Sequence, residues 1–229
     1  MSNRKVTGRR IGLFTFALFA AVGVHAGCRE ILSIEEKEFD PSLADGGTDG
    51  ATDPLSCEAY CDTIEALCTG NRRQFASRDA CIGLCSTYPK GTLEDETGNT
   101  LGCRIRMLEA GDAIETSECL AAGPGGDDQC GSNCKSFCAS IVTVCPGSFE
   151  STGDCETECA AWIKCGDYYV DPSVTPDNPS IQCRLYHMSA AAIGILEKED
   201  GMSTPAQDKH CPHAEGITEC IVDSGISCP

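Results

Sequence analysis

The chain has 229 residues, 19 of them Cys, and a formal net charge of −18 from 17 basic and 35 acidic residues. The acidic balance argues against nucleic acid and anionic membrane surfaces as partners, because both repel a negative protein surface. The high share of Cys is typical of disulfide-bonded proteins of an oxidising compartment and argues against the reducing cytosol. Since 19 is odd, one Cys needs a separate explanation.

Residues 1–27 have the pattern of an export signal. An apolar run over residues 11–24 is shorter than a membrane-spanning helix requires. The basic residues that precede this run are Arg4, Lys5, Arg9 and Arg10. Without them, 13 basic residues remain against 35 acidic ones, a net charge of −22.

The apolar run leads to Ala26-Gly27-Cys28, which resembles the lipobox of bacterial lipoproteins except at His25. The resemblance implies cleavage before Cys28 and a lipid anchor, including palmitate, on that residue. Because Arg29 is not the Asp that retains lipoproteins in the inner membrane, it also implies the outer membrane, on its periplasmic or surface face. The alternative is ordinary cleavage after Ala26, which would leave an exposed odd thiol.

Residues 28–56 contain the lipidated Cys and then a Gly- and Asp-rich stretch without helical or strand periodicity. Eight acidic residues against two basic ones make the segment self-repelling. We therefore predict a disordered tether. The spacing of Asp45, Asp49 and Asp53 does not follow the order of a calcium-binding EF-hand loop, which favours a solvated linker over a calcium site.

The remaining chain divides into two Cys-rich helical repeats, which we place at residues 57–132 and 133–229. Both open with C-x3-C-x6-C, both continue with a second C-x3-C, and the segments that begin at Cys103 and Cys183 also align. Eight Cys belong to this shared frame in each repeat, and the second repeat adds Cys165 and Cys228. The total is therefore 8, 10 and the single Cys28, which leaves an even number in each repeat.

The Cys spacing predicts helices, because residues four apart lie on one helical face. We expect a first helix over residues 55–69 with Pro54 in its first turn, and its counterpart capped by Ser132 or Asn133. The second helices should follow the caps Ser77 and Ser151. Third helices are expected over residues 103–114 and 182–197. The predicted fold is all-α and disulfide-rich, with about three short helices per repeat and disulfide-bound loops between them.

The paired C-x3-C helices resemble the twin C-x3-C helical hairpin of small oxidised proteins. That resemblance suggests outer-to-outer and inner-to-inner pairing, namely Cys57–Cys85 with Cys61–Cys81, and Cys134–Cys159 with Cys138–Cys155. The third Cys would tie each hairpin to the third helix, as Cys68–Cys103 and Cys145–Cys183. The pairs left over are Cys119–Cys130, Cys211–Cys220 and Cys165–Cys228.

Three histidines, His187, His210 and His213, fall in the second repeat, where the first repeat has Met107, Glu118 and Ala121. If the third helix packs on the Cys211 loop, the imidazoles could converge on a metal ion or a haem. The alternative is a half-buried helical His and two ordinary loop residues. No nucleotide-binding, zinc-ribbon or hydrolase motif is present, so catalytic residues are not assigned.

The blocks Cys-Arg-Leu-Tyr-His at 183–187 and His-Cys-Pro-His-Ala at 210–214, with the eight-Cys frame, resemble a Cys-rich secreted domain of bacterial lipoproteins. The likeness covers residues 57–228 and implies a cellular localisation and a fold but no activity. Our leading hypothesis is a non-enzymatic, lipid-anchored envelope protein without a cofactor, which contacts the membrane through its lipid and an unknown protein or envelope ligand. The alternatives are a metal- or haem-binding protein that uses the three histidines, and an enzyme with a loop-built site.

Overall fold

A computed structural model describes residues 53–109, 111, 114–171, 178–197, 203–218 and 220. These residues belong to one compact unit that spans residues 48–229. The expected signal peptide, Cys28, most of the tether and Cys228 lie outside the described residues. Within the described part, the predicted all-α, disulfide-rich fold is confirmed, and the one β feature is an isolated bridge between Ile163 and Ser180. No helix in this part is long and apolar enough to cross a bilayer.

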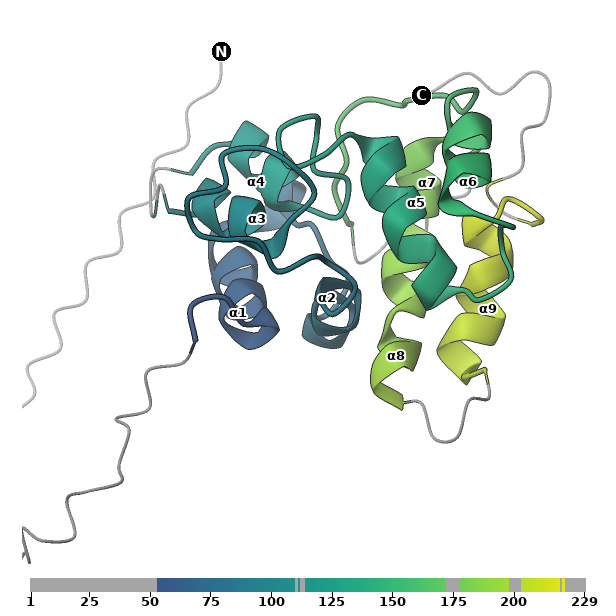
Figure 1. The fold of residues 1–229 in the computed structure, drawn as a ribbon, viewed down its shortest axis with the longest axis horizontal. Coiled ribbons are helices and arrows are strands. Elements are labelled where there is room, and N and C mark those ends of the chain that lie inside the picture. The colour runs from purple at the N-terminus through teal and green to yellow at the C-terminus, as the bar shows by residue number, and fades with distance from the viewer. Residues whose placement is uncertain are drawn as a thin grey trace, which may run out of the picture. The chain divides into compact units, whose positions relative to one another are not determined.

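The helices follow one another in two series, coloured from blue to yellow in Figure 1. The first series consists of α1 (Cys57–Leu67), the 3-10 turn η2 (Gly70–Arg72), α2 (Arg78–Cys85), α3 (Leu101–Met107) and α4 (Thr116–Ala122). The second consists of α5 (Asn133–Val144), α6 (Thr152–Cys159), α7 (Ile181–Ala191), α8 (Ile193–Glu197) and α9 (Pro205–Ala214). The expected boundary between residues 132 and 133 therefore falls at the start of α5.

Hydroxyl side chains begin most of these helices. Ser77 and Ser151, both expected as caps, accept hydrogen bonds from the amides of Ala80 and Asp154. Ser132 caps α5, so the helix starts at Asn133. Pro54 does not lie in the first turn of α1, because Ser56 caps that helix and Cys57 is its first residue. The end of the expected tether is part of the folded unit, since Asp53 forms an ion pair with Lys90 at 2.8 Å.

Two regions expected to be loops form the short helices α4 and α9. Each begins with a capping box, in which the cap side chain and the third helical residue satisfy each other's backbone amides. Pro212, which indicates a loop in the sequence, lies in the last turn of α9. The expected third helices are also corrected: α3 ends at Met107, and the segment that reaches Glu197 divides into α7 and α8 at Ala192.

The two series carry the same disulfide connectivity. In each, the first Cys of the frame pairs with the fifth, the second with the fourth, the third with the seventh and the sixth with the eighth. The bonds are Cys57–Cys85, Cys61–Cys81, Cys68–Cys119 and Cys103–Cys130, followed by Cys134–Cys159, Cys138–Cys155, Cys145–Cys211 and Cys183–Cys220. The four rungs that join paired C-x3-C helices are those suggested by the helical-hairpin resemblance.

The other four expected pairs are not those of the structure, and the unforeseen helices explain why. The helices α4 and α9 carry the seventh Cys of each series to the third Cys, at the C-cap of α1 or α5. The sixth Cys then meets the eighth. The corrected expectations are Cys68–Cys103, Cys119–Cys130, Cys145–Cys183 and Cys211–Cys220. Cys165 is disulfide-bonded, whereas its expected partner Cys228 lies outside the described residues.

The two helical series share a core rather than forming separate bodies. Helix α2 packs on α7 and α8, and a Cβ added at Gly83 would lie 2.0 Å from the carbonyl oxygen of Ala192. The hydroxyl of Thr87, two residues after α2, donates to that of Ser140 in α5 at 2.8 Å. Buried residues from both series form one apolar cluster. This packing places α7 between the first series and α9, where the histidines lie.

Candidate functional site

The three histidines of the second series converge between α7 and α9, two helices that pack along each other (Figure 1). His187 lies on α7 and has no exposed surface. His210 and His213 lie three residues apart on α9, so they share one helical face. Both are partly exposed. The site therefore has one deeply buried imidazole and two imidazoles near the surface.

Short nitrogen–nitrogen contacts define the geometry of this histidine cluster. Nδ1 of His187 lies 3.0 Å from Nδ1 of His210 and 3.3 Å from Nδ1 of His213. The imidazole rings of His187 and His213 are nearly perpendicular, at 87°, and their centroids are 4.6 Å apart. One ligating nitrogen from each of the three side chains lies within 4.8 Å of the others, a spacing that could hold a metal ion. The convergence that the sequence made conditional on helix packing is present in the structure.

A disulfide and a buried hydrogen bond hold α9, the helix that carries His210 and His213, in this geometry. Cys211, between His210 and His213 in the chain, is bonded to Cys145 at the C-cap of α5. The side-chain amide of Gln207 donates to the carbonyl oxygen of Val144 at 2.6 Å, and both groups are buried. Helix α9 is therefore attached to the end of α5 at two points, which restricts the imidazoles that it carries.

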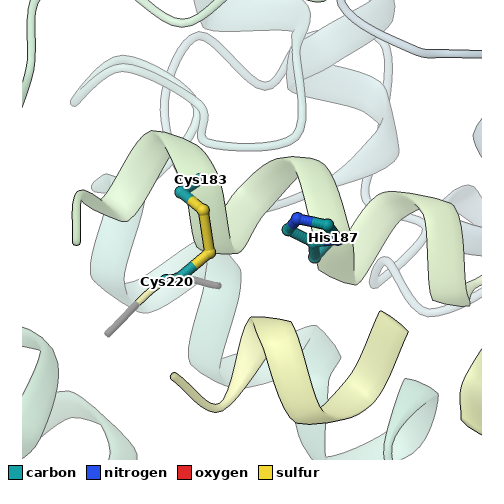
Figure 2. A group of neighbouring side chains, drawn as sticks. All are labelled: Cys183, His187 and Cys220. Atoms are coloured by element: carbon teal, nitrogen blue, oxygen red, sulfur yellow. A yellow bond between two sulfur atoms is a disulfide. The ribbon is translucent and has the colours of Figure 1, made fainter. Parts of the chain in front are cut away.

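A second group of potential ligands consists of Cys183, His187 and Cys220. Figure 2 shows these side chains together, with the two sulfur atoms joined in a disulfide beside the imidazole. A disulfide sulfur is not the thiolate that binds metals in proteins. The two Cys therefore serve as a covalent link between α7 and the segment at Cys220. The candidate ligands are the imidazoles alone.

Two buried arginines form a feature that the sequence analysis did not single out. Arg104 and Arg184 directly follow the sixth Cys of their series, and each donates to the carbonyl oxygen of the eighth Cys, at 2.9 and 3.2 Å. The guanidinium of Arg104 lies 4.2 Å from the ring centroid of Tyr88, and that of Arg184 lies 3.9 Å from the ring centroid of Trp162. The signal for this feature was the shared Cys-Arg pair, which has the same structural role in both series.

Burial changes the acidity of the second of these arginines. Desolvation lowers the pKa of Arg184 to about 10, and the negative charge of Glu158 opposes that shift. The side chain also donates to the carbonyl oxygen of Ala214 at 3.0 Å. Arg184 thus connects α7 to the end of α9 and to the segment at Cys220, and it supports the helix pair that carries the histidines.

Comparison with known proteins gives one match. Residues 47–133 match the family described as the BfoA family C-terminal domain. The matched part contains α1 to α4 and ends at the first residue of α5, so it coincides with the first helical series. No curated protein and no solved structure matches the chain. The match supports a Cys-rich domain in the first half, and the histidine cluster lies beyond it.

Proposed function

We propose that the protein is a lipid-anchored component of the cell envelope that displays a disulfide-stapled helical body for interaction or envelope structure rather than for catalysis. The observation that supports this most strongly is the disulfide pattern. All 17 described Cys are disulfide-bonded, which fits an exported protein of an oxidising compartment. A body with covalent links in every hairpin is suited to exposure at a surface.

The Cys count supports the anchor. If Cys165 pairs with Cys228 as expected, Cys28 is the single Cys that remains for a lipid. The segment before it has the basic and apolar regions of an export signal. One lipidated residue followed by a net negative tether would hold the helical body away from the membrane. The negative charge of the helical body also disfavours its contact with an anionic membrane surface.

An internal duplication is part of the same proposal. The two series share the order of their disulfides. In each, the aromatic residue three positions after the fifth Cys stacks against a buried Arg. Repetition of both the covalent frame and a buried polar contact supports descent from one ancestral unit. The histidines occur in the second series alone, so the copies would have diverged at that face.

The anchor is tested by expressing the full chain in a bacterium that processes lipoproteins, with labelled palmitate and with mass spectrometry of the N-terminal peptide. We expect label in the outer-membrane fraction and a lipid on Cys28. The variant Cys28→Ser should lose the label, whereas the control His25→Leu, which is closer to the lipobox pattern, should keep it. A mature chain that begins at Gly27 with a free thiol would contradict the proposed anchor.

The interaction role is tested by chemical crosslinking in intact cells of the native host. The wild-type chain should give discrete crosslinked products with envelope components, identified by mass spectrometry. A variant with Cys61 and Cys81 both replaced by Ala removes one rung of the first hairpin and should give fewer of these products. A wild-type chain that stays uncrosslinked with reagents for amines and for carboxylates would contradict an interaction role.

A further inference from the structure

The histidine cluster brings one ring nitrogen from each of three side chains close together. Nδ1 of His187 is close to the Nδ1 atoms of both His210 and His213. A ring nitrogen offers one direction away from the ring, which holds either a proton or a lone pair. An electrophile placed among the three nitrogens could therefore accept a lone pair from each of them.

The spacing fits a single metal ion. In a tetrahedral site with metal–nitrogen bonds of about 2.0–2.1 Å, adjacent nitrogens are about 3.3–3.4 Å apart. The contacts of 3.0 and 3.3 Å are within a few tenths of an ångström of this value. A haem held between His187 and either of the other two imidazoles does not fit, because axial nitrogens on opposite faces of the macrocycle would be roughly 4 Å apart, twice such a bond length.

On this basis we propose that His187, His210 and His213 bind one divalent transition-metal ion, of which Zn²⁺ and Cu²⁺ are the chemically suited examples. Imidazole is a favoured ligand for both ions. Three His ligands leave one position of a tetrahedral Zn²⁺ ion for water or another small ligand. The site goes beyond the proposed envelope role, and neither the disulfide frame nor the lipid anchor depends on it.

The surrounding structure favours binding in three ways. The bonds Cys145–Cys211 and Cys183–Cys220 fix the helices that carry the ligands, so little conformational freedom is lost when an ion binds. The partial exposure of His210 and His213 gives the ion a route from solvent to the buried imidazole. The acidic chain also attracts cations electrostatically.

The test uses the exported, oxidised chain after treatment with a chelator. Zn²⁺ is titrated against a competing chelator, bound metal is counted by mass spectrometry, and Co²⁺ serves as a spectroscopic probe of coordination. We expect one tightly bound ion per chain, an absorption spectrum of four-coordinate Co²⁺ and a higher melting temperature with Zn²⁺. Binding should weaken as the pH falls, since protons compete for the imidazole nitrogens.

Variants identify the ligands. His210→Gln and His213→Gln change partly exposed residues, so each should fold with wild-type disulfides and lose affinity at least about 100-fold, more than the loss caused by removing an outer-shell contact. The matched control Lys209→Gln alters an exposed residue of the same helix and should bind as the wild type does. His187→Gln, checked for folding by circular dichroism, should also abolish binding.

Three results would overturn the proposal. The first is a wild-type chain without a stoichiometric Zn²⁺ or Cu²⁺ ion at micromolar metal. The second is unchanged affinity in both His210→Gln and His213→Gln, which would locate the ion elsewhere, among the acidic residues for example. The third is an equal loss in Lys209→Gln, which would show that the losses arise from disturbance of α9 and not from removal of ligands. None of these results would affect the lipid anchor or the crosslinking outcome, so the two proposals are tested separately.

Discussion

Replacement of Gly83 by Ala provides a sharp test of how the two helical series pack. Gly83 lies in α2 between two Cys that bind α1, and its open side faces the junction of α7 and α8. A Cβ at this position would lie 2.0 Å from the carbonyl oxygen and 2.6 Å from the carbonyl carbon of Ala192. Because the obstacle is backbone, the helices would have to separate by about 1.5 Å to reach ordinary contact distances of about 3.5 Å.

The expected magnitude follows from two opposing effects. Overpacking costs about 1–3 kcal/mol, and a clash between two backbones belongs at the upper end of that range. Ala is favoured over Gly in a helix by about 0.5–1 kcal/mol, which offsets part of the cost. The net loss of unfolding free energy should be about 2 kcal/mol, equivalent to a decrease in melting temperature of about 4–8 °C for a chain of this size.

The same substitution at Gly153 is the matched control. Gly153 lies in the first turn of α6, and the nearest atom to an added Cβ would be the hydroxyl oxygen of Ser151, at 3.7 Å. Gly153→Ala should therefore be neutral or stabilise the protein by about 0.5 kcal/mol. Thermal unfolding of the oxidised chain, followed by circular dichroism, measures both variants. A Gly83→Ala variant as stable as the wild type would refute the close approach of α2 to the α7–α8 junction.

Three further outcomes follow from the structure. Arg184→Lys should lower the unfolding free energy by about 2 kcal/mol in the same thermal assay, because Lys cannot keep both the stacking and the forked hydrogen bonds. The control Arg106→Lys changes a partly exposed residue and should alter the unfolding free energy by less than about 0.5 kcal/mol. Peptide mapping without reductant should find Cys145 joined to Cys211, and a peptide that joins Cys145 to another Cys would contradict this connectivity. Replacing both residues by Ala should lower the unfolding free energy by about 2–5 kcal/mol. Hydrogen bonds from Thr100 and Thr92 hold the pKa of the Asp95 carboxyl below its ordinary value of 3.8. The stabilisation from this carboxylate is therefore present at neutral pH and disappears as the pH falls through the lowered pKa. A carboxyl that titrates at or above 3.8 by NMR would be inconsistent with these bonds.

The local structure was largely predictable from spacing and capping residues. The C-x3-C pairs place Cys on one helical face, and such a face can be linked twice to another like it, as α1 is to α2. Ser77 and Ser151 begin their helices because a hydroxyl satisfies an exposed backbone amide. These are short-range effects within a few residues, so the sequence alone carries enough information to predict them.

The long-range disulfides were not predictable in the same way. Cys68 could have paired with any Cys that reached the end of α1, and its actual partner, Cys119, depends on a seven-residue helix whose signal is weak among Gly and Pro residues. The buried positions of Arg104 and Arg184 likewise require an aromatic ring from the turn that follows another helix. In both cases a residue's role depends on a neighbour that is distant in the chain.

The histidine cluster shows where the two kinds of information meet. The sequence by itself determined the all-α class, the Cys-rich helical hairpins, the acidic charge and the presence of three histidines in one half, since these depend on composition and local periodicity. Only the tertiary structure decided that His187 meets His210 and His213, because that contact depends on how α7 packs on α9. Packing sums many weak contacts across the whole core, and no short segment of the chain encodes its outcome.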